Sequence, residues 1–203
     1  MTTEEARHDR SEIAIGITLA LLAAVMTFCN MAGGRFSYYF TIASQKQTES
    51  LSWYQSKSIK QSLVEGQRDM LASQHRTGML TPGAVEGATT YVAELDAEIT
   101  RYRREKEEIL RGSAAVGKEN WAQAVDGKLG NVKGAQEWQA EATKLGDIGG
   151  LLESATLYLQ MALVFGAIAL LFRSVRARWI FFFAMSGLGT AGSYYTLLAF
   201  AAF

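Results

Sequence analysis

The chain has 203 residues, carries no formal net charge and is 49% hydrophobic. This balance offers no basic face of the kind that nucleic-acid binding requires, so no nucleic-acid partner is expected. The single cysteine, Cys29, excludes an internal disulfide framework, and it lies in an apolar run where a buried thiol is the expected state.

Three runs without any charged residue stand out, at 13–34, 155–172 and 179–203. A helix that crosses a bilayer needs about 20 apolar residues, so each run predicts a transmembrane helix, the second a short one. The first run is longer than the core of a cleaved signal peptide, and the leader at 1–12 mixes acidic and basic residues. We therefore expect an uncleaved anchor, with the lipid bilayer as a partner.

The basic turn at 173–178 predicts the sidedness of the chain through three residues, Arg173, Arg176 and Arg178. Lys and Arg are concentrated in short cytoplasmic loops, so this turn is expected in the cytoplasm. With three spans the leader at 1–12 is then cytoplasmic too, which agrees with Arg7 and Arg10. In a Gram-negative cell the segment 35–154 would lie in the periplasm, and the chain would be a multi-pass protein of the bacterial inner membrane.

The segment 35–154 is predicted to form an extramembrane, antiparallel helical stalk, which makes the whole chain an all-α membrane protein. Glycine and proline are scarce in its first part, so a helix should continue out of the first apolar run as far as the turn around Pro82. From Val85 to Leu110, hydrophobic residues recur at spacings of four and three. This is the pattern of a coiled-coil seam, and Leu95 and Ile99 belong to it.

The stretch 112–134 is less regular. It contains glycines at 127, 130 and 134, each of which weakens a helix by about 1 kcal/mol relative to alanine. Hydrophobic residues still recur there at an approximate three-four spacing, which favours a third stalk helix that runs into the second apolar run. The sequence shows no strand pattern, and the alternatives of helix and loop stay open.

The stretch LSWYQSKSIKQ, at 51–61, combines aromatic and basic residues beyond the first span. One line along the predicted helix carries small and apolar residues: Ser52, Ser56, Ile59, Leu63, Gly66 and Met70. A second line carries Trp53, Lys57, Lys60, Val64 and Leu71, with Tyr54 beside it. Two lines indicate two helical neighbours, one within the chain and one from elsewhere, and Trp53 would be a natural anchor of a subunit contact. The alternative is a ligand site in which Lys57 and Lys60 bind an acidic group.

The remaining candidate motifs indicate packing rather than chemistry. The stretch GLGTAG, at 187–192, lies in an apolar run without a preceding strand, so Gly187 and Ala191 are expected to serve close helix packing rather than nucleotide binding. Asn30 and Gln160 are amides that can hydrogen-bond across helices. The two histidines lack the spacing of zinc ligands. We expect no catalytic residue, cofactor or metal.

With these residues placed, the chain resembles a family of bacterial inner-membrane proteins that is grouped as a domain of unknown function. The similar parts are an N-terminal span, the W-Y-Q-x-K-x-x-K helix at 53–60, the charged helix RYRREKEEIL and a final pair of spans around the basic turn. The resemblance implies this architecture and no catalytic residue.

The expected function is therefore that of a non-enzymatic, membrane-anchored helical scaffold. Such a protein would self-associate as a homo-oligomer or serve as an accessory subunit beside other membrane-protein subunits. One alternative is a periplasmic sensor or ligand-binding module that needs a partner for its output. A lesser alternative is an oligomeric channel, against which the uncharged spans argue.

Overall fold

The computed structural model describes the backbone of residues 3–203 and the side chains of residues 12–203. Arg7 and Arg10, which support the predicted sidedness, lie outside the described side chains. The chain divides into two compact units. Unit 1 consists of Met1–Phe40 with Thr143–Phe203, and unit 2 consists of Thr41–Ala142. The all-helical fold class predicted from the sequence is confirmed, with one small exception in unit 2.

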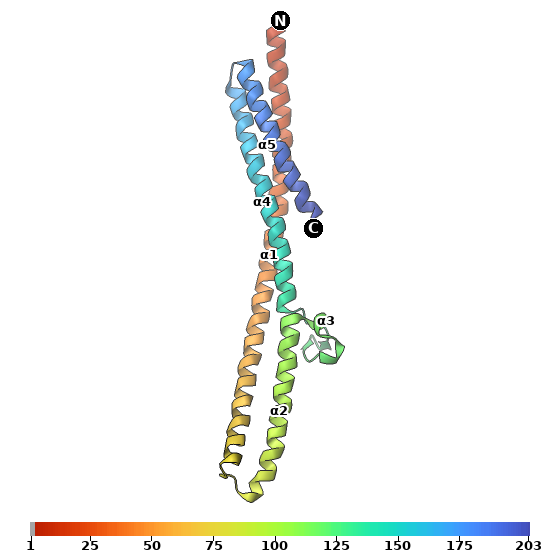
Figure 1. Cartoon of the computed structure of the whole chain (residues 1–203). Coiled ribbons are helices and arrows are strands. Elements are labelled where there is room, and N and C mark those ends of the chain that lie inside the picture. Colours follow the sequence, from red (N-terminus) through yellow and green to blue (C-terminus); the bar gives the residue numbers. More distant parts are fainter. Residues whose placement is uncertain (1–2) are drawn as a thin grey trace. The chain divides into compact units, whose positions relative to one another are not determined.

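Unit 1 contains the first part of α1 (Thr3–Arg76), most of α4 (Ala135–Leu171) and all of α5 (Val175–Ala201). Within this unit α4 and α5 run beside α1 and are joined by a short turn (Figure 1). The main core of the unit contains six buried residues: Leu22, Cys29, Ala155, Leu159, Ala162 and Met185. A second cluster contains Ala32, Phe36, Ile148, Leu152 and Ala199. All three helices therefore contribute to one apolar interior.

Two helices are long and apolar enough to cross a membrane, namely Glu12–Arg76 of α1 and Ala135–Leu171 of α4. The sequence predicted three such spans, but by helix length and hydropathy only two of the described helices qualify. The segment predicted as the third span does form a helix, α5. Its second half, however, contains glycines, serine, threonines and a pair of tyrosines, and α5 is not among the helices that are apolar enough by this measure.

The most apolar stretches of these two helices are largely uncovered by protein. Only 17% of the apolar window in α1 is buried, and only 28% of the window in α4. Large side chains such as Ile13, Leu21 and Leu157 are more than half exposed. A core helix of a water-soluble protein would be mostly buried, whereas the described part of this chain leaves most of this apolar surface exposed.

Unit 2 is built on a helical hairpin. Helix α1 ends at Arg76, and α2 (Pro82–Arg111) runs back beside it in the opposite direction (Figure 1). Pro82 occupies the first turn of α2, where its missing N–H leaves no intrahelical bond unmade. Val64 of α1 is buried with Leu95 and Ile99 of α2. The three-four spacing of the predicted seam thus places its large residues inside the hairpin.

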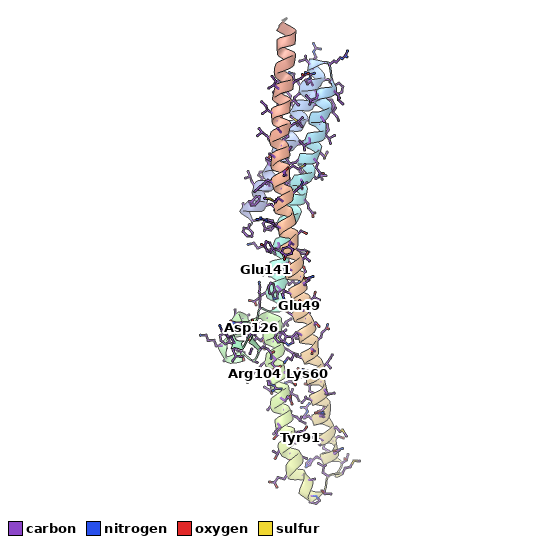
Figure 2. The ribbon with its side chains drawn as sticks, turned by 180° about the vertical axis from the view of Figure 1, so that it is seen from behind. Glu49, Lys60, Tyr91, Arg104, Asp126 and Glu141 are labelled. Atoms are coloured by element: carbon purple, nitrogen blue, oxygen red, sulfur yellow. The ribbon has the colours of Figure 1, made fainter. Side chains whose placement is uncertain are left out.

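The stretch 112–134 folds as a small knob beside α2, and the third stalk helix favoured by the sequence is wrong for this stretch. The knob contains α3 (Ser113–Val116), the 3-10 helix η1 (Lys118–Asn120) and an antiparallel pair of strands, β1 (Ala124–Val125) and β2 (Lys128–Leu129). Figure 2 labels Asp126 in the knob and Arg104 on α2.

A tight turn explains why the knob departs from a helix. Asp126 and Gly127 connect the two strands, with φ values of 51° and 75°. Positive φ at both central residues defines the turn that matches the twist of a two-stranded hairpin, and the Asp-Gly pair is a strong signal for it. Glycines at 112, 117 and 130 also adopt positive φ. Backbone requirements therefore prevail over the approximate helical spacing.

Candidate functional site

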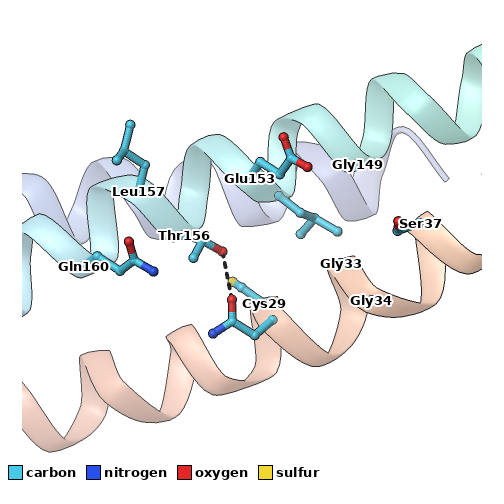
Figure 3. Close-up of a pocket in the computed structure, with 11 residues that line it drawn as sticks. Cys29, Gly33, Gly34, Ser37, Gly149, Glu153, Thr156, Leu157 and Gln160 are labelled. Carbon is cyan, nitrogen blue, oxygen red and sulfur yellow. Dashed lines mark hydrogen bonds between the residues drawn. The ribbon is translucent and has the colours of Figure 1, made fainter.

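A groove of about 410 Å³ lies between α1 and α4 in unit 1 (Figure 3). Its lining combines polar side chains with glycines and two leucines: Cys29, Asn30, Gly33, Gly34, Ser37, Gly149, Leu152, Glu153, Thr156, Leu157 and Gln160. Both amides singled out from the sequence, Asn30 and Gln160, belong to it. Several polar groups of α1 and α4 are thus gathered along one opening.

Glycines on both helices produce this groove. A Cβ atom built at Gly33 would lie 3.9 Å from the Cβ atom of Leu152, an ordinary contact distance. At Gly34 and Gly149 such an atom would meet nothing within 4 Å. Larger side chains at these positions would fill the space, so the glycines leave room for an external group.

A hydrogen bond between Thr156 and Asn30 crosses the groove. Thr156 Oγ1 donates to Asn30 Oδ1 at 3.4 Å, a long bond that joins α4 to α1 (Figure 3). Asn30, Glu153 and Gln160 are all exposed, so their remaining donors and acceptors face outward. The groove can therefore hydrogen-bond a ligand or another helix.

Cys29 lies at the floor of this groove and is completely buried. Its Sγ atom lies 3.0 Å from Oγ1 of Thr196, and this hydroxyl donates its proton to the carbonyl of Gly192 at 2.9 Å. A hydroxyl has one proton to donate, so the thiol must be the donor in the first bond. This arrangement makes Cys29 a packing residue that joins α1 to α5.

Close packing on α5 involves two other glycines of the stretch 187–192 rather than Gly187. Gly189 and Gly192 are buried, and a Cβ atom at either would lie within 3 Å of Leu22 or Leu159. Gly187 is exposed, with nothing within 4 Å of such an atom, and Ala191 is half-buried. The hypothesis that Gly187 and Ala191 contact another helix stays a prediction for a neighbour outside this chain.

The three arginines that predict sidedness occupy different environments. Arg173 and Arg176 are exposed, whereas Arg178 is only 2% exposed. Arg178 Nη2 lies 3.3 Å from a carboxylate oxygen of Glu12 and donates to the carbonyl of Phe172 at 2.9 Å. Arg178 therefore ties α5 to α1, a structural role that loop composition does not reveal.

In unit 2 the two lysines of the stretch 51–61 are placed differently. Lys57 Nζ donates to Glu105 Oε2 at 2.6 Å and lies 5.8 Å from the ring centre of Tyr102. Lys60 is exposed. The ammonium of Lys57 is therefore engaged by the hairpin itself, whereas that of Lys60 faces outward, and the acidic-ligand site at these two lysines stays an untested alternative.

The hydrophobic and aromatic candidates also separate into two groups. Trp53 and Tyr54 are half-buried, and Lys106 of α2 lies 5.2 Å from the Tyr54 ring centre. Ile59 and Leu63, by contrast, are 70% and 66% exposed. The line that contains Lys57 and Val64 thus faces α2, and the line that contains Ile59 and Leu63 faces outward.

Two groups in the hairpin have shifted pKa values. The pKa of Glu65 is lowered from its ordinary value of 4.5, first by the hydrogen bond from Gln61 and further by Arg103 and Arg68. The pKa of Tyr102 is raised above 10.0, first by burial and then by nearby Glu98. The first shift thus arises mainly from a neighbour on the same helix, with a contribution from Arg103 of α2, and the second arises mainly from burial in the hairpin.

The knob is held by a buried carboxylate that sequence analysis did not identify. Glu108 is completely buried; it accepts a hydrogen bond from Ser113 Oγ at 2.7 Å and two from the backbone N–H groups of Ala122 and Gln123, each at 2.8 Å. Ser113 Oγ in turn accepts from the N–H of Val132. The Asp-Gly turn was the available signal for the knob, whereas nothing in the sequence marked Glu108.

The knob also joins α4 through a capping contact. Glu137 in the first turn of α4 accepts a hydrogen bond from the N–H of Gly134 at 2.8 Å, the return half of a capping box. A Cβ atom at Gly134 would lie 2.2 Å from the backbone nitrogen of Gly112. Glycine is therefore required at position 134 by close backbone approach.

These features define an all-helical protein with two apolar, exposed helices, a polar groove between them and a helical hairpin that carries a small knob. The chain belongs to the family described as a domain of unknown function (DUF4337), which matches residues 11–202. No curated protein and no solved structure was found to match the chain.

Proposed function

We propose that the chain is a non-enzymatic, membrane-anchored helical scaffold that self-associates or serves as an accessory subunit of a membrane assembly. The observation that carries this proposal is the exposure of the apolar windows of α1 and α4, of which 17% and 28% are buried. Burial of apolar surface contributes about 25 cal/mol per Å², so a bilayer is the cover that this surface favours.

The proposed sidedness follows from the basic turn before α5. Arg173 and Arg176 are exposed there and suit the cytoplasmic side of a bacterial inner membrane. If α1 and α4 each cross once, residues 41–142 then lie on the opposite, periplasmic side. This part of the proposal needs only two spans, so it does not depend on whether α5 also crosses.

Membrane fractionation and thiol labelling test the anchoring and the sidedness. A cysteine introduced at Ala114, which is exposed, should react with a membrane-impermeant maleimide in intact spheroplasts of a Cys29→Ser variant. A cysteine at Ser174 should react only after lysis. Ala114 is the suitable probe because neighbouring Ser113 is buried by Glu108. Recovery of the chain in the soluble fraction would contradict anchoring, and reversed labelling would contradict the sidedness.

Self-association is tested by the mass of the particle in a mild detergent. We expect a homogeneous particle larger than one chain, either of copies alone or with a fixed second subunit. A monodisperse monomer at all protein concentrations would contradict the scaffold function, whereas the membrane anchoring would remain possible.

The groove of unit 1 favours a second candidate function, that of a ligand-binding module. Its exposed carboxylate, Glu153, together with the amide oxygens of Asn30 and Gln160, suits a small amine or another cationic group. Ligands of this class should raise the melting temperature of the purified chain. Glu153→Gln should abolish the rise, and Glu141→Gln, which removes an exposed carboxylate outside the groove, should retain it. A monomer that shows this response would support the sensor rather than the scaffold.

A further inference from the structure

The outward-facing line on α1 in unit 2 forms a continuous surface, which we call the outer stripe. It consists of Ser52, Ser56, Ile59, Leu63, Gly66 and Met70, all of which are exposed. Its three large residues, Ile59, Leu63 and Met70, are each more than 60% exposed. The described part of the chain therefore leaves this surface uncovered.

The outer stripe has the spacing of a coiled-coil seam. Its members alternate by four and three residues from Ser52 to Met70, which assigns them to the d and a positions of successive heptads. None of them is charged. The seam that packs against α2 lies on another face of α1, where Val64 is buried. Helix α1 thus carries two seams in this unit, and α2 occupies only one.

We infer that the outer stripe joins copies of this chain in a parallel coiled coil. The inference rests on the proposed anchoring in a membrane, because copies with the same topology are then related by an axis along the membrane normal. Such an axis brings equivalent residues to the same height, so each stripe residue can meet its own counterpart. Closed symmetric contacts of this kind are the commonest in homo-oligomers.

The charges beside the stripe agree with a second copy in parallel orientation. In parallel heptads the g position of one helix faces the following e position of the next, which places Gln55 opposite Lys60 and Asp69 opposite Gln74. No like charges oppose each other in this arrangement. An antiparallel pair with the stripe fully overlapped would set Lys60 against Lys60, a destabilising contact.

The small residues of the stripe also fit a helix partner. A Cβ atom at Gly66 would meet nothing within 4 Å, and Ser52 and Ser56 add little bulk. Two helices can therefore approach closely at these layers, while Ile59 and Leu63 provide the apolar contacts between them. The stripe thus combines large apolar residues, Ile59, Leu63 and Met70, with small ones on which a second helix can pack closely.

Disulfide cross-linking in native membranes tests this inference. In a Cys29→Ser background, Ile59→Cys should form a covalent dimer upon mild oxidation. Ala97→Cys is the matched control, since Ala97 is exposed and lies two residues from both Leu95 and Ile99, on the opposite face of α2. We expect cross-linking through position 59 to be at least about tenfold faster, because equivalent d residues meet in a parallel coiled coil. Equal rates for the two variants would overturn the inference.

A charge variant provides a test that does not depend on cross-linking. Ile59→Asp with Leu63→Asp should reduce the particle mass in detergent, while helix content and melting of the hairpin persist because both side chains are exposed. Met79→Asp, at an exposed residue in the turn after α1, should leave the mass unchanged.

The outcomes separate this inference from the proposed function. If the wild type assembles and the Ile59→Asp, Leu63→Asp variant forms a particle of the same mass, the outer stripe is not the contact between copies. The scaffold proposal is then unaffected. A wild-type chain that is soluble or monomeric would overturn the scaffold, and the inference with it. A particle in which position 59 cross-links only to a different protein would also overturn the stripe as a contact between copies.

Discussion

Lys57 on α1 and Glu105 on α2 form a close ion pair, with Nζ and Oε2 2.6 Å apart and side chains only 16% and 7% exposed. This pair lies in the contact between the two helices of the hairpin, under the ring of Tyr102. A lysine held in this way joins the two helices of the hairpin. The expectation that Trp53 anchors a subunit contact stays a prediction.

Lys57→Ala should destabilise the hairpin by about 3 kcal/mol, because it leaves a mostly buried carboxylate without its main partner. This is the lower end of the usual range, since Arg101 remains 3.5 Å from Glu105. Lys60→Ala, which removes an exposed lysine one turn away, should change the free energy of unfolding by less than about 0.5 kcal/mol. Thermal melts of the full chain in detergent measure both, and equal effects would contradict the role of the pair.

Glu108→Gln should loosen the knob without disrupting the hairpin. Glutamine has only one side-chain oxygen, so its NH2 group would replace one of the two oxygens that now accept hydrogen bonds. Hydrogen bonds to a charged group contribute about 1.5–3 kcal/mol each, and part of this stabilisation would be lost. We expect faster hydrogen exchange at the N–H groups of Ala122 and Gln123. Exchange at Leu95 and Ile99 should stay slow and serves as the internal control. Unchanged protection at Ala122 would mean that Glu108 does not hold the knob.

Gly134→Ala should destabilise the junction of the knob with α4 by about 3 kcal/mol, because the added methyl group would clash with backbone atoms that cannot yield easily. Gly87→Ala is the matched control. Gly87 lies in α2 with free space around it, so alanine should stabilise the helix by about 0.5–1 kcal/mol. Chemical denaturation of the two variants should therefore give shifts of opposite sign.

The pKa of Glu65 predicts an acid-dependent component of hairpin stability. Because the pKa is lower in the folded state than its ordinary value of 4.5, the stabilisation is fully present above pH 4.5. It is lost as the pH falls through the lower, folded value. Glu65→Gln should therefore lose less stability than the wild type between neutral pH and acid, as measured by melting temperature. Parallel curves for the two proteins would contradict the shift.

The sequence by itself determined the helical class, the turn near Pro82 and the two most apolar helices. The reason is local: long uncharged runs and three-four periodicity depend only on composition and order along the chain. The same periodicity placed Leu95 and Ile99 on one face, and that face is buried in the hairpin. Periodicity failed at 112–134, where the positive φ of Asp126 and Gly127 requires a turn.

Only the tertiary structure decided which of two faces of α1 is occupied by α2. Both faces carry apolar residues at helical spacing, and the choice depends on partners distant in sequence, such as Glu105 for Lys57. Long-range contacts also decided that Glu108 and Arg178 are buried, since each is compensated by groups that composition cannot bring together. A charged residue is stable inside a protein only when such partners are assembled around it, and their positions are set by the fold.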